Sequence, residues 1–270
     1  MVLPSLLLLT IFYFYPILRL VPRSFIDEDG HVTISFFARV FTDPLYRTAL
    51  FRTLRIAVLA TLINLLLGYP VAYALSRAGK KMADFIMGVI MISFWTSLLV
   101  RVYAWMAILQ RTGILSTFLT KIGIMSELHS FMYTDFAVLL GMSNILLPYM
   151  ILPIYSILKS VDTNLEVAAM SLGASSSQAF LKVTLPLSAP GIASGCVLVF
   201  IQSLGFYVIP IMLGGPRVLM ITSLIDDQMF TYMNWNFGSA LGMVLLLITV
   251  IFLAGFDKLF GIDKLSNSMM

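Results

Sequence analysis

One stretch of the sequence is set apart by charge, because the chain around it is strongly apolar. Residues 159–191 contain Lys159, Asp162, Glu166 and Lys182. A charge forced to the centre of a bilayer costs about 2.5 to 3.5 kcal/mol, so burying all four would cost roughly 10 kcal/mol or more. We therefore expect this segment to lie outside the lipid, where its side chains can recognise a partner.

The local pattern of this segment predicts a short helix over 164–172. Thr163 and Glu166 have the spacing of a capping box, in which each side chain bonds a free backbone N–H at the start of a helix. Gly173 stands where a left-handed residue would end that helix, a conformation that glycine adopts without a steric penalty. We expect one compact helix followed by a break.

The predicted helix carries an apolar stripe and has nothing of its own to bury it against. Leu165, Ala169 and Leu172 fall at i, i+4 and i+7, which places them on one face. A second, turn-rich piece at 176–184 should stop before Pro186, because the residue before a proline disfavours helical geometry. A short helix with an exposed stripe favours docking to another protein.

Metal and disulfide chemistry find no support in the sequence. The single cysteine, Cys196, excludes an internal disulfide framework and a cysteine-based metal cage. The two histidines, His31 and His129, stand in separate polar segments without a cluster of other ligands. We predict no metal site, and we interpret Cys196 as a small buried apolar side chain.

Enzymatic function and nucleic-acid binding are disfavoured as well. No Gly-x-x-x-x-Gly-Lys-Ser/Thr run occurs, so the chain should not bind and hydrolyse ATP by itself. Gly141-Met142-Ser143 loosely resembles the nucleophile motif of an intramembrane serine protease, but a serine needs a nearby base and neither histidine lies in an apolar stretch. The net charge of +4 is too small and too dispersed to indicate nucleic acid. We predict that the chain is not an enzyme and carries no cofactor.

Membrane helices must hold the segment 159–191 in place. Of the 270 residues 60% are hydrophobic and 11% are charged, and the mean hydropathy of +0.97 indicates a polytopic membrane protein. A helix needs about 20 apolar residues to cross the hydrocarbon core. We predict one all-α transmembrane domain over 1–270, with the polar loop 159–188 and six spans at 2–20, 56–76, 85–109, 136–158, 190–213 and 237–256.

Polar and aromatic side chains within the spans are candidates for a transport path. Asn144, Pro148 and Pro153 lie in the fourth span, and such residues survive at membrane depth only where protein or a cavity satisfies them. Arg101 is interpreted as reaching toward the far interface. The path candidates are Trp95, Tyr103, Trp105, Asn144, Tyr149, Gln202 and Tyr207.

The polar loop resembles the EAA loop of the membrane subunits of bacterial binding-protein-dependent ABC importers. The pattern AA-x-x-LGAS-x-x-x-x-F-x-x-V-x-LP runs from Ala168 to Pro186. In that family the loop is cytoplasmic and seats in a groove of the ATP-hydrolysing subunit. The resemblance implies an ATPase-coupling role for Glu166, Ala168, Ala169, Leu172, Gly173, Ala174, Ser175, Phe180 and Pro186.

One position departs from the family pattern. The glutamate of the EAA triplet would fall at Val167, and Glu166 stands one place earlier. The docking role is implied by the remaining positions, whereas an ion pair from the family's glutamate is not.

The resemblance also implies an assembly and a location. It implies the type I importer permease fold with a cytoplasmic coupling helix, a second and related permease, two ATPase subunits that hold ATP and Mg²⁺, and a soluble periplasmic binding protein that delivers a small molecule. It implies a multi-pass protein of the bacterial inner membrane with both termini in the cytoplasm. Lysines and arginines are more frequent on the opposite side of the spans, so this orientation rests on the resemblance and not on the charges.

Longer runs are most similar to the permeases of spermidine/putrescine-type importers. They include the segments 53–75, 146–155, 208–217 and 234–241. A polycation path would favour carboxylates or aromatic faces, and the spans offer aromatic residues but no buried acid. The implied substrate is a polyamine or a related small solute.

Two other transport classes stay open from the residues alone. A secondary transporter would fit the spans, although ion coupling usually leaves acidic or basic pairs inside the membrane. A channel for a small solute is disfavoured only by the docking loop. Uptake that persists without ATP but collapses with the ion gradient would favour the secondary transporter.

Overall fold

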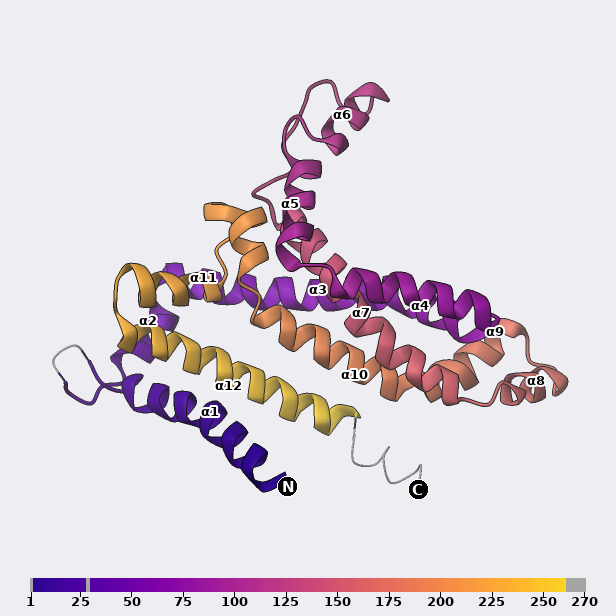
Figure 1. The fold of residues 1–270 in the computed structure, drawn as a ribbon, viewed down its shortest axis with the longest axis horizontal. Coiled ribbons are helices and arrows are strands. Elements are labelled where there is room, and N and C mark those ends of the chain that lie inside the picture. Colours follow the sequence, from indigo (N-terminus) through magenta and orange to yellow (C-terminus); the bar gives the residue numbers. More distant parts are fainter. Residues whose placement is uncertain (1, 28–29, 261–270) are drawn as a thin grey trace. The chain divides into compact units, whose positions relative to one another are not determined.

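The computed structural model describes residues 2–27 and 30–260, and it is built from helices (Figure 1). The α-helices are α1 (Val2–Arg23), α2 (Ser35–Thr42), α3 (Pro44–Arg77), α4 (Lys80–Trp95), α5 (Leu98–Leu109), α6 (Ile114–Lys121), α7 (Asp135–Ser160), α8 (Asn164–Ser171), α9 (Ser176–Ala179), α10 (Leu185–Leu204), α11 (Ile221–Asp226) and α12 (Trp235–Phe260). Short helical segments of other kinds lie between some of the α-helices. They are the π-helical segments η1 (Phe180–Thr184), η2 (Pro210–Gly214) and η4 (Asp227–Thr231) and the 3₁₀-helical segment η3 (Gly215–Arg217). The all-α prediction is confirmed.

Within the described residues, five helical stretches are long and apolar enough to cross a membrane. They are Pro44–Arg77, Leu98–Lys121, Asp135–Ser160, Ser176–Leu204 and Trp235–Lys258. The first predicted span, 2–20, coincides with α1, which is not among these five. The count of six spans therefore stays a prediction.

The described residues fall into two compact units. One is formed by the residues up to Leu54 together with Leu219–Phe252, and the other by Arg55–Val218 with the residues from Leu253 onward. The first unit has an apolar core around Phe237, against which the ring of Tyr46 packs edge-on at 4.9 Å. Within it the Thr53 hydroxyl accepts a hydrogen bond from the backbone N–H of Ile221 at 2.9 Å.

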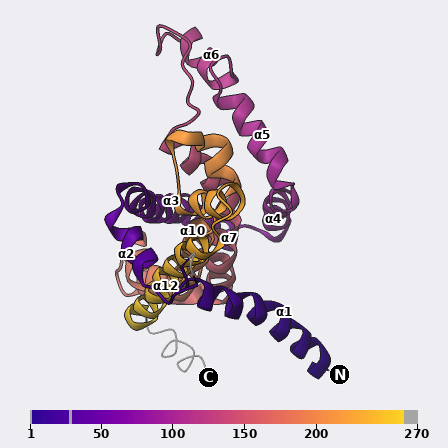
Figure 2. The same ribbon diagram turned by 90° about the vertical axis from the view of Figure 1, so that its left-hand side faces the viewer.

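The second unit is organised around α7, the most buried of the five candidate spans, with 61% of its apolar window inside the protein. Helices α7 and α10 lie side by side (Figures 1 and 2). A Cβ added at Gly191 of α10 would stand 2.9 Å from the Cα of Ile154, so only glycine permits this close approach of the two helices. This packing fixes the helices from which the loop 159–188 leaves and to which it returns.

The third predicted span, 85–109, does not form one helix. Helix α4 ends at Trp95 and α5 begins at Leu98, with Thr96 and Ser97 in extended geometry between them. The Thr96 hydroxyl donates to the carbonyl of Ile92 at 2.7 Å, and such side-chain bonds compete with the helical ladder. Both views show α5 turned away from the line of α4 (Figures 1 and 2).

The fifth predicted span, 190–213, is displaced at both ends. Helix α10 begins at Leu185 and ends at Leu204, and the helical stretch that could cross a membrane is Ser176–Leu204. The expected stop before Pro186 is wrong, because this proline occupies the first turn of α10, where its missing N–H has no intrahelical partner to lose. The π turn η1 directly precedes α10, so the loop 159–188 already contains the start of the membrane-length helix.

Candidate functional site

Helix α8 is the exposed part of the predicted loop. None of its residues is buried; Val167 is 55% exposed, and Leu172, which directly follows the helix, is 90% exposed. Among the described residues α8 contacts mainly α9 and η1, its own neighbours in the loop. Figure 1 shows α8 at the end of the α7 and α10 pair. The helix therefore presents apolar side chains that its own unit does not cover.

The break after α8 is made by Gly173. Its φ is +93°, the left-handed conformation that the pattern predicts. The backbone N–H of Gly173 bonds the carbonyl of Met170 at 3.0 Å, and the N–H of Ala174 bonds the carbonyl of Ala169 at 3.1 Å. These bonds satisfy the free carbonyls at the helix end and turn the chain toward α9.

The predicted capping box at Thr163 and Glu166 is wrong. Thr163 is itself helical, with φ −64° and ψ −22°, and its side chain makes no capping bond. The Asp162 carboxylate instead accepts from the N–H of Asn164 at 2.9 Å. The Glu166 side chain is engaged elsewhere, so it does not return to the helix start.

A capping box forms one helix later, at Ser175 and Gln178. The Ser175 hydroxyl accepts from the N–H of Gln178 at 3.3 Å, and the Gln178 carbonyl accepts from the N–H of Ser175 at 3.1 Å. Sequence reasoning missed this box, although Ser-x-x-Gln is the same signal.

Glu166 faces the rest of its own unit. Its carboxylate lies 2.5 Å from Nη2 of Arg77 at the end of α3, and the Thr184 hydroxyl donates to the same carboxylate oxygen. The Glu166 side chain is only 16% exposed. The sequence offered no local signal for this ion pair, because Arg77 lies far away along the chain.

Phe180 likewise packs inward. Its ring meets the ring of Tyr69 at 5.9 Å and that of Tyr73 at 5.4 Å, edge-on in both cases. Such pairs contribute about 0.5 to 1.5 kcal/mol beyond the area that they bury. Phe180 therefore attaches the loop to α3.

The predicted coupling residues divide into an inner and an outer group. Glu166 and Phe180 contact α3. Ala169 and Ala174 are half-buried, and the remaining members are exposed: Ala168, Leu172, Gly173, Ser175 and Pro186. The outer group is the surface that a partner could contact.

The path candidates are brought together only in part. Trp105 and Asn144 line one cavity of about 360 Å³, together with Leu67 and Ser143. The Ser143 hydroxyl is buried and has no hydrogen-bond partner among the described residues. The sequence analysis considered Ser143 only as a possible nucleophile and did not include it among the path candidates. Two of the seven path candidates therefore share a cavity, and the path itself stays a prediction.

The other path candidates lie outside that cavity. Tyr149 and Trp95 pack against Phe94, with ring centroids at 5.3 and 6.2 Å. Tyr103, Gln202 and Tyr207 have exposed side chains and do not line the cavity. Arg101 lies near the start of α5, where its Nε and Nη1 are buried without a hydrogen-bond partner in the described part of the chain.

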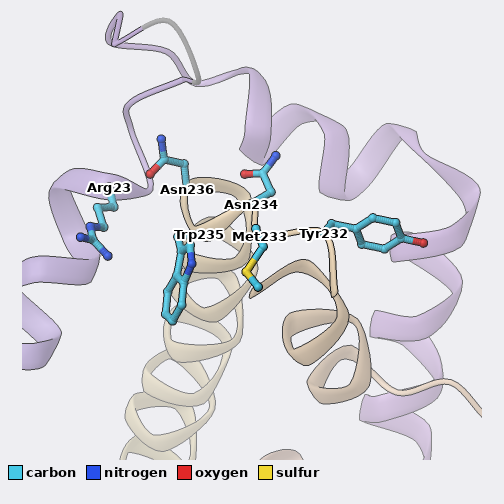
Figure 3. A pocket seen from close by; sticks show the side chains of 6 residues that line it. All are labelled: Arg23, Tyr232, Met233, Asn234, Trp235 and Asn236. Atoms are coloured by element: carbon cyan, nitrogen blue, oxygen red, sulfur yellow. The ribbon is translucent and has the colours of Figure 1, made fainter. Parts of the chain in front are cut away.

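The first unit holds a separate open cavity of about 710 Å³, which the sequence did not indicate (Figure 3). Arg23 and the segment from Tyr232 to Asn236 line it. Met233 has a φ of +54°, a strained value for a residue with a Cβ, and Asn236 donates to the carbonyl of Asp27 at 3.2 Å. Figure 3 shows Tyr232 pointing away from Trp235 and Arg23.

Metal ligands do not gather in the described residues. No group of three or more His, Cys, Asp or Glu side chains is placed there to hold a metal ion.

Comparison with known proteins connects this architecture to transport. Residues 64–259 match the family model described as "Binding-protein-dependent transport system inner membrane component". The spermidine/putrescine transport system permease protein PotB of Haemophilus influenzae is 36% identical over 252 residues, which cover 90% of this chain and 88% of that protein. PotB of Escherichia coli K12 is 35% identical over 248 residues, covering 89% of each. The E. coli inner membrane ABC transporter permease protein YdcU is 30% identical, covering 94% of this chain and 87% of YdcU.

Solved structures share the fold. A chain of a bacterial ABC transporter involved in alginate import has a TM-score of 0.82 at 18% identity, covering 96% of this chain and 93% of that one. A chain of the MetNI methionine ABC transporter has a TM-score of 0.58 at 17% identity, covering 84% of this chain and 95% of that one. The chain belongs to the family of binding-protein-dependent transport system inner membrane components, and is thus a multi-pass inner-membrane permease subunit of an ABC importer.

Proposed function

We propose that this permease admits polyamines such as spermidine and putrescine, or a closely related small cation. The observation that carries the proposal is its similarity, over nine tenths of its length, to relatives named for spermidine and putrescine transport. Among the described residues no carboxylate is buried within a candidate span, so the cation would be held by aromatic faces and neutral polar groups. Each cation–π contact contributes about 0.5 to 2 kcal/mol.

The path proposed for this substrate runs past the cavity of Trp105 and Asn144. An indole face and an amide oxygen can both stabilise an ammonium group, and the unpartnered Ser143 hydroxyl adds a further acceptor. Buried polar groups are normally hydrogen-bonded, so a buried hydroxyl that has no partner among the described residues supports a cavity occupied by water or substrate. The other proposed path residues are Trp95, Tyr103, Tyr149, Gln202 and Tyr207.

ATP hydrolysis is assigned to separate subunits, which would hold ATP and Mg²⁺. The outer group of the loop would seat in a groove of such a subunit, with both termini of this chain on the same, cytoplasmic side. Moving a gate from 1:99 to 99:1 needs about 5.5 kcal/mol of differential interaction, and burying one apolar side chain contributes roughly 1.5 to 3 kcal/mol. Burial of the exposed Leu165 and Leu172 would therefore contribute an interaction of that order without any chemistry in this chain.

The proposed assembly pairs this chain with a second permease and a periplasmic binding protein. When this chain carries an affinity tag and is purified from the native membrane, we expect an ATPase subunit and a second permease to copurify with it. If neither copurifies, the proposed coupling through α8 is wrong.

Transport of radiolabelled spermidine into proteoliposomes that contain the complete importer tests the substrate. We expect ATP-dependent uptake that requires the binding protein and that unlabelled putrescine reduces, whereas an unlabelled neutral sugar does not. Uptake that continues without ATP and collapses with the ion gradient would instead support a secondary transporter. Failure of spermidine both to enter and to compete with any transported solute would contradict the polyamine assignment.

A further inference from the structure

One face of α3 contacts the loop at three successive helical turns. Tyr69, Tyr73 and Arg77 are spaced at i, i+4 and i+8, which places them in a row along the helix. The Tyr69 hydroxyl lies 3.0 Å from the Ser188 hydroxyl at the start of α10. Tyr69 and Tyr73 together hold the Phe180 ring, as described above. Arg77, at the last of these three turns, contacts Glu166 of α8.

The Arg77 contact with α8 is a partly buried ion pair. The side chains of Arg77 and Glu166 are 27% and 16% exposed, so water and salt screen the pair less than they screen a surface pair. The guanidinium carbon of Arg77 also lies 5.4 Å from the Tyr73 ring centroid. Nε of Arg77 is buried with no hydrogen-bond partner among the described residues. Without Glu166, the contact with the Tyr73 ring would be the remaining interaction described above that offsets the free-energy cost of burying the Arg77 guanidinium.

Glu166 stands one place before the position of the EAA glutamate, and the two positions face different surroundings. Successive helix residues are rotated by about 100°, so moving a glutamate by one place turns it to another side of the helix. Val167, at the family's glutamate position, is exposed, whereas Glu166 points toward α3. Position 167 thus holds an exposed apolar side chain, and the charge at position 166 forms an ion pair within the chain.

We propose that Arg77 is a positioning residue for coupling. Through Glu166, and through the Thr184 hydroxyl that shares the same carboxylate oxygen, it fixes α8 to the end of α3, a candidate membrane span. A displacement of α8 is then passed to α3 directly, in addition to passing along the chain through η1 and α10. The inference rests on the proposed docking of the loop to an ATPase subunit.

A charge swap in the complete importer tests this role. Arg77→Glu and Glu166→Arg should each lower the amount of solute transported per ATP hydrolysed by about tenfold, because each puts two like charges together in a partly buried place. The double variant R77E/E166R should recover to within about threefold of the parent, since it restores an ion pair of reversed sense. Lys80→Glu, at an exposed position at the start of α4, is the matched control and should leave the ratio unchanged.

A second measurement reports position without relying on transport. A spin label at Ser171, an exposed residue of α8 outside the outer group, in a chain with Cys196→Ser, should become more mobile in the assembled importer when Arg77→Glu is introduced, and should regain its parental spectrum in the double variant. If Arg77→Glu behaves like Lys80→Glu in both measurements, or if the double variant is no better than the single ones, the positioning role is wrong.

Different results would refute the docking of the loop and the role of Arg77. If the ATPase subunit does not copurify with the parental chain, the docking of the loop itself is wrong. If the parent assembles and couples normally and the charge variants do so too, only the role of Arg77 is refuted.

Discussion

Leu172→Glu should reduce ATP-driven uptake by at least about a hundredfold, an effect that corresponds to about 2.8 kcal/mol. The Leu172 side chain is almost fully exposed, so its own unit loses no packing when it is replaced. A leucine seated in an apolar groove contributes roughly 1.5 to 3 kcal/mol by burial, and a carboxylate in the same place adds a desolvation penalty. The protein should therefore insert and fold normally while its contact with the ATPase subunit fails.

The measurement is uptake and ATP hydrolysis in proteoliposomes, together with copurification of the ATPase subunit. Val167→Glu is the matched control, because it introduces the same charge at another exposed position of the loop and restores the family's EAA glutamate. We expect this variant to stay within about threefold of the parent. Parental uptake by the Leu172→Glu variant would show that this surface is not a docking face.

Gly173→Val should lower uptake about thirtyfold, through the backbone and not through crowding. A Cβ built at Gly173 meets no atom within 4 Å, so the site has room for a larger side chain. The φ of +93° is the obstacle, because a β-branched residue in this region costs of the order of 1 to 3 kcal/mol. The variant should relieve that strain by unwinding the break, which changes the direction in which α8 is presented.

Gly173→Asn separates strain from size. Asparagine tolerates left-handed geometry better than most residues with a Cβ, so this variant should retain most of the uptake. If the valine and asparagine variants transport equally well, the left-handed break is not needed for coupling.

The parts of the fold that could be predicted are those with a strong local signal. The apolar run of the fourth span predicted a helix at 136–158, and α7 covers it with small extensions at both ends. Gly173 was identified because few other residues adopt its backbone geometry without strain. In both cases the deciding physics lies within a few neighbouring residues.

The errors arise where the structure depends on contacts or competition that spacing does not reveal. The break between α4 and α5 lies at Thr96 and Ser97, with neither glycine nor proline to mark it. The capping box failed because Glu166 has a stronger partner in Arg77, which is close only after folding. A charged acceptor that pairs with a partly buried guanidinium outweighs a bond to a helix end that water can satisfy.

The path residues show the same limit. Seven were selected because they were polar or aromatic within spans, and two of them, Trp105 and Asn144, line the cavity of about 360 Å³ in the described part of the chain. Membership of a span indicates depth but not the direction in which a side chain points. The break between α4 and α5 also means that Tyr103 and Trp105 do not continue the helix that contains Trp95.

The central claim, that α8 and its break form the contact with the ATPase subunit, is tested most directly by a photo-crosslinking amino acid at position 172 in living cells. We expect one major adduct whose mass is that of this chain plus the ATPase subunit. An adduct with the periplasmic binding protein, with lipid or within this chain alone would contradict it.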